Sequence, residues 1–85
     1  MGTPTGPVQL GVEDVRAIDK EMADTRHDVN NYLAVLSAAL EMIRFRPEQA
    51  ERFLASAMEQ PTRITTRLRQ CSDFLGTKLA ITQDR

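Results

Sequence analysis

The chain has 85 residues, of which 41% are hydrophobic and 27% charged, values typical of one small globular domain rather than of a disordered segment. The formal net charge is −1 and basic residues are spread among acidic ones, which argues against a nucleic-acid-binding surface. No apolar run approaches the roughly 20 residues that a membrane-spanning helix needs, and the N-terminus lacks the order of a signal peptide. We therefore expect one cytoplasmic domain that does not insert into a membrane.

The chain contains one cysteine, Cys71, and one histidine, His27. A single cysteine makes no internal disulfide, and a single histidine forms no cluster for zinc, so we expect no metal site. The interpretation favoured for Cys71 is a small buried apolar side chain. Residues 1–11 carry two prolines and three glycines, a composition that predicts a flexible leader.

The first structural element predicted is a helix over residues 12–45. Neither glycine nor proline occurs between Val12 and Phe45, so nothing in this stretch interrupts a helix. Its apolar residues recur three or four positions apart, as on one face of a helix: Val15, Ile18, Met22, Thr25, Val29, Tyr32, Leu36, Ala39 and Ile43. Apolar residues also flank this seam after His27 but not before it, which indicates a bundle that is thickest C-terminal to His27.

Arg46-Pro47 predicts a turn, because the residue before a proline is pushed out of the helical region while proline itself suits the first position of a new helix. A second apolar stripe predicts a helix over residues 47–76, with Gly76 as its stop and residues 77–85 as a tail. Pro61 predicts either a kink in this helix or a break between two shorter ones. A short turn makes the helices antiparallel, which places Thr65 level with His27.

The expected fold is therefore all-α, an antiparallel helical hairpin over residues 12–76. A lone hairpin of this size covers only one side of each helix. We expect a second copy to cover the remaining apolar surface, giving a homodimeric four-helix bundle.

The helical period places His27 outside the core. It lies about 200° around the helix from Val29, so its imidazole is expected to face solvent. Asn31 lies about 40° from it one turn on, and Asp28 lies beside it at about 100°. An exposed imidazole next to a carboxylate and an amide is suited to nucleophilic chemistry, although most exposed histidines on helices are simply solvated.

The string Thr25-Arg26-His27-Asp28-Val29-Asn30-Asn31-Tyr32-Leu33 resembles the phosphoacceptor box of the dimerisation and histidine-phosphotransfer domain of bacterial sensor histidine kinases, in particular the subgroup reading His-Asp-x-Asn-Asn. The Thr/Arg/Leu-rich stretch from Thr62 to Leu68, leading to Asp73-Phe74, is also similar to that family. The chain departs from it at Tyr32, where many members have proline. It also lacks the ATP-binding domain with its glycine-rich motif.

The resemblance implies a phosphoacceptor and dimerisation module of a two-component signalling histidine kinase. His27 would accept the phosphoryl group, Asp28 would orient the imidazole and act as general base, and Asn31 would position water for dephosphorylation of a partner. The implied partners are a response-regulator receiver domain and a kinase domain acting in cis or in trans. That separate domain would bind ATP and magnesium, so no cofactor is expected in this chain.

The face of His27 and Asn31 continues to Ala34, Val35 and Ala38, a smooth and weakly apolar surface on which we expect a receiver domain to dock. Alanines are also good helix formers, which is a sufficient reason for their presence. Three alternatives stay open: a purely structural dimerisation module in which His27 is incidental, a stand-alone histidine phosphotransferase, and a monomeric phosphotransfer protein that completes its bundle with another chain. Whether the chain counts as an enzyme by itself is likewise open.

Overall fold

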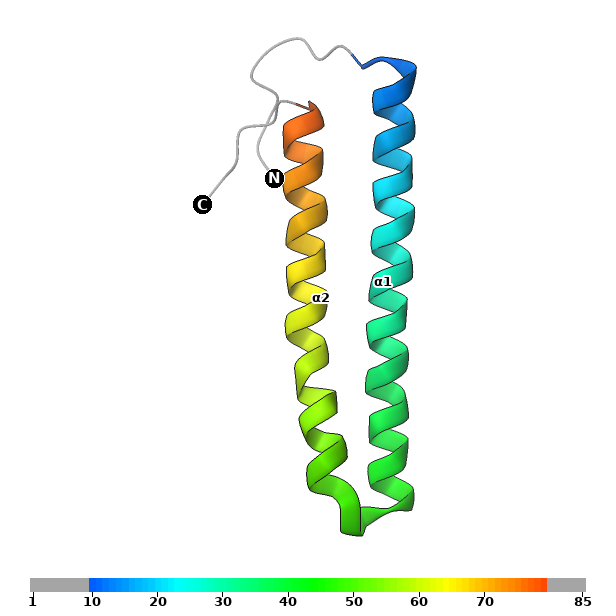
Figure 1. The fold of residues 1–85 in the computed structure, drawn as a ribbon, viewed down its shortest axis with the longest axis vertical. Helices are drawn as coiled ribbons and strands as arrows, with labels where there is room; N and C mark the ends of the chain where they lie inside the picture. The colour runs from blue at the N-terminus through cyan, green and yellow to red at the C-terminus, as the bar shows by residue number, and fades with distance from the viewer. Residues whose placement is uncertain (1–9, 80–85) are drawn as a thin grey trace.

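The computed structural model describes residues 10–79, which form a helical hairpin. Helix α1 spans Val12–Phe45, a 3₁₀ turn η1 spans Pro47–Gln49, and helix α2 spans Ala50–Leu79. The two helices run antiparallel and side by side from the turn (Figure 1). The predicted all-α hairpin is confirmed, and so are the predicted bounds of the first helix. Residues 1–9 of the predicted leader and residues 80–85 of the predicted tail lie outside the described part.

Both ends of α1 follow from local chemistry. At the start, the extended Gly11 donates its backbone N–H to the Asp14 carboxylate at 3.3 Å, and the acids Glu13 and Asp14 lie in the first turn, where the helix dipole favours negative charge. At the other end, Arg46 has φ −135° and ψ 68°, outside the helical region, while its N–H still bonds to the Met42 carbonyl at 2.8 Å. The proline that follows accounts for this backbone change.

The second helix begins three residues later than predicted. Pro47 opens the 3₁₀ turn, and the N–H of Gln49 bonds to the Arg46 carbonyl at 2.9 Å. A 3₁₀ turn is tighter than an α-helical one. It therefore reverses the chain direction within a few residues before α2 starts at Ala50.

Helix α2 is continuous through Pro61 (Figure 1), so the predicted alternative of two shorter helices is wrong. Proline has no N–H to donate to the preceding turn. Side chains on either side of it add bonds to this stretch: Gln60, which is 4% exposed, donates its amide to the Ser56 carbonyl at 2.9 Å, and Thr65 donates its hydroxyl to the Pro61 carbonyl at 3.0 Å. The chain accommodates the proline within one helix.

The helix also passes through Gly76, where the sequence predicted a stop, and extends to Leu79. A glycine inside a helix costs only about 1 kcal/mol. Beyond it, the Lys78 ammonium bonds to the Asp14 carboxylate of α1 at 3.3 Å. Contacts with the other helix therefore extend beyond the position at which the sequence signal predicted an end.

The predicted register of the two helices is confirmed by this same pair. Asp14 precedes Arg46 by 32 residues and Lys78 follows it by 32, so residues equally distant from the turn lie level with one another. His27 and Thr65 stand at such equal distances. The middle of α2 is thus opposite the histidine of α1.

The side chains that the single hairpin buries most fully are small or polar. Thr25 and Ala39 of α1 and Ala57 and Gln60 of α2 are buried, and the two from α1 belong to the predicted seam. Larger apolar side chains stay exposed in the single hairpin: Val15, Met22, Leu33, Leu40, Leu54, Met58 and Leu68. Cys71 is half-buried. Each helix therefore carries apolar surface that the other does not cover.

Neither α1 nor α2 combines the length and the apolar character needed to cross a membrane.

We expect Pro61→Ala to stabilise the hairpin by about 1–3 kcal/mol, because alanine restores a backbone donor and has the highest helix propensity. Pro61 is exposed, so the substitution leaves no cavity. Urea unfolding followed by circular dichroism measures the change, with the exposed neighbour Thr62→Ala as control. A loss of stability would instead mean that the proline geometry is required for packing.

Candidate functional site

The candidate site is centred on His27, which is exposed on α1 as predicted. Its ring atom Nε2 lies 3.3 Å from the side-chain nitrogen Nδ2 of Asn31, one turn further along the helix. An amide nitrogen only donates, so Nε2 accepts in this arrangement and the ring proton resides on Nδ1. The bond is long and exposed, so Asn31 favours one tautomer without blocking Nε2 from other partners.

Asp28, the neighbour of His27, bonds instead to the opposite helix. Its carboxylate atom Oδ2 accepts a hydrogen bond from Arg67 Nε of α2 at 2.8 Å. The same guanidinium donates from its terminal nitrogen to Glu21 Oε1 at 2.6 Å. One arginine of α2 thus bridges two acids that lie two turns apart on α1.

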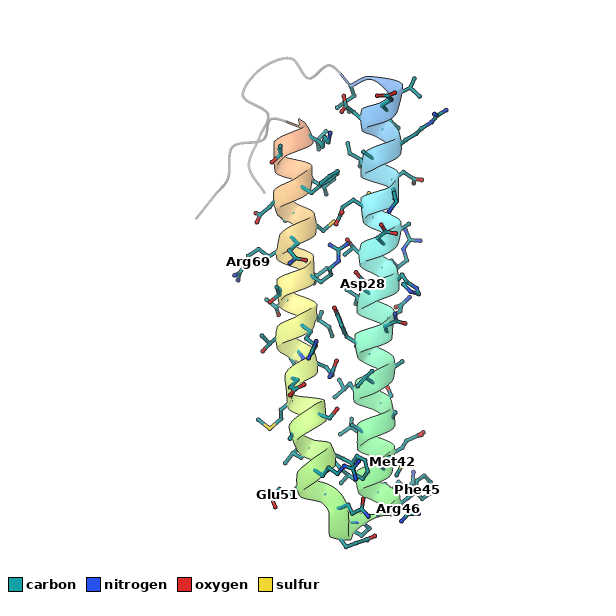
Figure 2. The ribbon with its side chains drawn as sticks, in the orientation of Figure 1. Asp28, Met42, Phe45, Arg46, Glu51 and Arg69 are labelled. Carbon is teal, nitrogen blue, oxygen red and sulfur yellow. The ribbon has the colours of Figure 1, made fainter. Side chains whose placement is uncertain are left out.

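This bridge is well shielded from water on the arginine side. The Arg67 side chain is 13% exposed, against 20% for Glu21 and 38% for Asp28. The hydrogen bonds to Asp28 and Glu21 raise the pKa of Arg67 further above its ordinary value, because both carboxylates stabilise the charged guanidinium. Asp28 lies on the side of α1 that faces α2, whereas Arg69 points away from α1 (Figure 2).

The geometry bears on the predicted role of Asp28. Within residues 10–79 no hydrogen bond joins the Asp28 and His27 side chains, and the carboxylate atom Oδ2 is occupied by Arg67. Its orienting and general-base roles therefore stay predictions. Sequence reasoning missed Arg67 and Glu21 altogether. The signal available was the register, which places residue 67 opposite the stretch of α1 that contains both acids.

Along the exposed surface of α1, charged side chains precede His27 and small apolar side chains follow it. Before His27, the ammonium of Lys20 pairs with the Asp24 carboxylate at 2.5 Å; the hydrogen bond lowers the pKa of Asp24 and raises that of Lys20. After His27, the predicted docking residues Ala34, Val35 and Ala38 are all exposed. They form an accessible surface next to the histidine, and docking there stays a prediction.

Two grooves run along the junction of the helices. One is lined mostly by polar and charged residues: Tyr32, Thr62, Arg63, Thr66, Arg67 and Gln70. The other is mainly apolar and is lined by Met22, Thr25, Arg26, Val29, Leu68 and Cys71. Thr66 and Leu68 lie about 200° apart around α2, so the grooves open on opposite faces of the hairpin.

In the described part of the chain, His, Cys, Asp and Glu side chains do not gather in groups of three or more that would suit a metal ion. Comparison of the chain with models of known protein families, with curated proteins and with solved structures found no match.

Proposed function

We propose that this chain is the phosphoacceptor and dimerisation module of a two-component signalling pathway. His27 would accept a phosphoryl group and pass it to the aspartate of a receiver domain. The observation that carries the proposal is an exposed imidazole whose Nε2 faces an amide one turn away, with its tautomer biased by that amide. The surrounding string resembles the His-Asp-x-Asn-Asn box, and for this reason we interpret the geometry as that of a phosphoacceptor site.

The proposed reaction has two steps. In the first, the lone pair of His27 Nε2 attacks the terminal phosphorus of ATP held by a separate kinase domain; the P–O bond breaks, ADP leaves with the electron pair, and the Nδ1 proton passes to a carboxylate. In the second, a carboxylate oxygen of the receiver attacks the phosphorus. The N–P bond breaks, its electron pair returns to Nε2, and the ring takes up a proton.

Small side chains near His27 suit this exchange. In-line transfer requires the donor and the acceptor to approach the imidazole closely. Ala34 and Ala38 lie exposed about two and three turns beyond His27, and their methyl groups offer little steric obstruction. A receiver domain seated on this surface would bring its aspartate to the phosphohistidine.

The dimeric part of the proposal has separate support. Large apolar side chains stay exposed on both helices, and the apolar groove joins them across the junction. Exposed apolar side chains that line a shared groove mark a candidate interaction site. A second hairpin packed on this face would complete a four-helix bundle.

The second candidate is a purely structural dimerisation module, which the same apolar groove favours without any role for His27. One experiment separates the two. Wild-type and His27→Ala proteins are incubated with ATP in extract of the source cells, and intact mass and acid lability of any added phosphate are measured. An acid-labile phosphate on the wild type alone supports phosphotransfer, and none on either protein favours the structural module.

We expect Asn31→Ala to slow dephosphorylation of a receiver domain by at least about tenfold, because water positioning contributes strongly to such reactions. Loading of His27 should change by less than about threefold, since the long Asn31 bond contributes little. Release of inorganic phosphate from a phosphorylated receiver, in the presence of each variant, measures the effect. Asn30→Ala is the matched control, because Asn30 is also exposed but lies about 100° away from Asn31. Equal rates for both variants would remove Asn31 from the proposed role.

A further inference from the structure

A half-buried bridge between the helices lies immediately next to the proposed phosphoacceptor. Arg67 of α2 donates to Asp28 at 2.8 Å and to Glu21 at 2.6 Å. Asp28 directly follows His27, yet its carboxylate is held toward α2, about 100° around α1 from the imidazole. The group best placed in sequence to take a proton from His27 is thus engaged by the opposite helix.

The shape of the guanidinium explains why the bridge holds two acids at once. Arginine presents several N–H donors in a rigid planar fork, and Nε and a terminal nitrogen point in different directions. Thr25 donates its hydroxyl to the Glu21 backbone carbonyl at 2.7 Å and lies 3.4 Å from Glu21 Oε1, so Arg67 is the main partner of the Glu21 carboxylate. The Glu21 arm anchors Arg67 to α1, so the Asp28 arm can open without Arg67 leaving the junction.

We propose that Arg67 is a positioning residue that sets the availability of Asp28 to His27. While the Arg67–Asp28 bond is formed, the carboxylate points toward α2. When a small displacement of α1 against α2 breaks this bond, Asp28 becomes free to accept the Nδ1 proton of His27, and Nε2 is left as the nucleophile. This inference deepens the proposed function and rests on it for its biological meaning. The geometry of the hairpin would then control the reactivity of its histidine.

A spectroscopic test does not depend on phosphorylation. His27 is the only histidine, so its ring nitrogens give unambiguous signals in a long-range ¹H–¹⁵N NMR spectrum, which reports the ratio of the two tautomers. Arg67→Met removes every donor but keeps an apolar stem. The ratio of the Nδ1–H to the Nε2–H tautomer is expected to rise at least about tenfold, as a new hydrogen bond to a charged acceptor would produce.

Two further variants assign the cause of this change. Adding Asp28→Asn to Arg67→Met is expected to return the ratio to the wild-type value, because the amide no longer attracts the Nδ1 proton as a carboxylate does. Arg69→Met is the matched control, since Arg69 is exposed and points away from α1 (Figure 2). Should Arg67→Met lose its helical circular dichroism signal, Arg67→Gln takes its place, because its uncharged amide binds a carboxylate more weakly.

The results separate this inference from the proposed function. The positioning role is overturned if the folded Arg67 variant has the wild-type tautomer ratio. It is also overturned if Arg67→Met changes this ratio equally with and without Asp28→Asn. Acid-labile phosphate on the wild type in the ATP experiment tests the proposed function independently. If the positioning role of Arg67 and the proposed function both hold, Arg67→Met is also expected to be phosphorylated about fivefold faster on His27 than the wild type. Arg69→Met is expected to be phosphorylated at the wild-type rate.

Discussion

His27→Ala is expected to abolish acid-labile phosphorylation of the chain, reducing it to background, while leaving the helical content and thermal unfolding unchanged. The proposed phosphoryl acceptor is the imidazole itself, and the chain has no second histidine to replace it. His27 is exposed, so its removal leaves no buried cavity, and alanine favours a helix. Intact mass before and after brief acid treatment measures the phosphate, because an N–P bond on histidine hydrolyses in acid whereas a phosphate ester on serine or threonine survives.

Two controls make this result specific. Asn30→Ala changes an exposed neighbour of the same helix and is expected to be phosphorylated like the wild type. Phosphate that persists on His27→Ala and resists acid would instead indicate an ester on a hydroxyl side chain. That outcome would contradict the role of His27 and leave the hairpin as a structural module.

The first helix was predictable because its limits are set locally. From Val12 to Phe45 no residue interrupts the helix, and Arg46-Pro47 ends it through a steric effect between neighbouring residues. The exposure of His27 was predictable for a similar reason, since helical geometry alone places it on the opposite side from Val29. These features require no knowledge of which side chains touch across the hairpin.

The features that were missed depend on contacts across the hairpin. Gly76 carries a local stop signal, yet α2 continues to Leu79 and Lys78 pairs with Asp14 across the junction. The partner of Asp28 was missed because the sequence gives its angle around α1 and not the reach of a long side chain from α2. Arg67 extends to both acids of α1, and only the juxtaposition of the helices reveals this.

Leu68→Glu is expected to weaken self-association by at least about a hundredfold. Leu68 lines the apolar groove and is 51% exposed in the single hairpin, so a second copy on this face would cover it. Fully burying an exposed leucine stabilises by about 1.5–3 kcal/mol, and about half of this value remains for the half-exposed Leu68. In a two-fold symmetric dimer each substitution acts twice, so the lost apolar burial alone costs about 1.5–3 kcal/mol. Enclosing two glutamate carboxylates costs several kcal/mol more, and each 1.4 kcal/mol is a factor of ten in the dissociation constant.

Light scattering coupled to size-exclusion chromatography measures this change as a fall from the mass of two chains to that of one. The matched control is Val35→Glu, because Val35 is 44% exposed and does not line the apolar groove. We expect it to leave the mass of the assembly unchanged while weakening any receiver docking next to His27. A wild-type mass of one chain would contradict the homodimer. Loss of the dimer in both variants would mean that the interface extends around α1 to the His27 side, where it would compete with a receiver domain for the same surface.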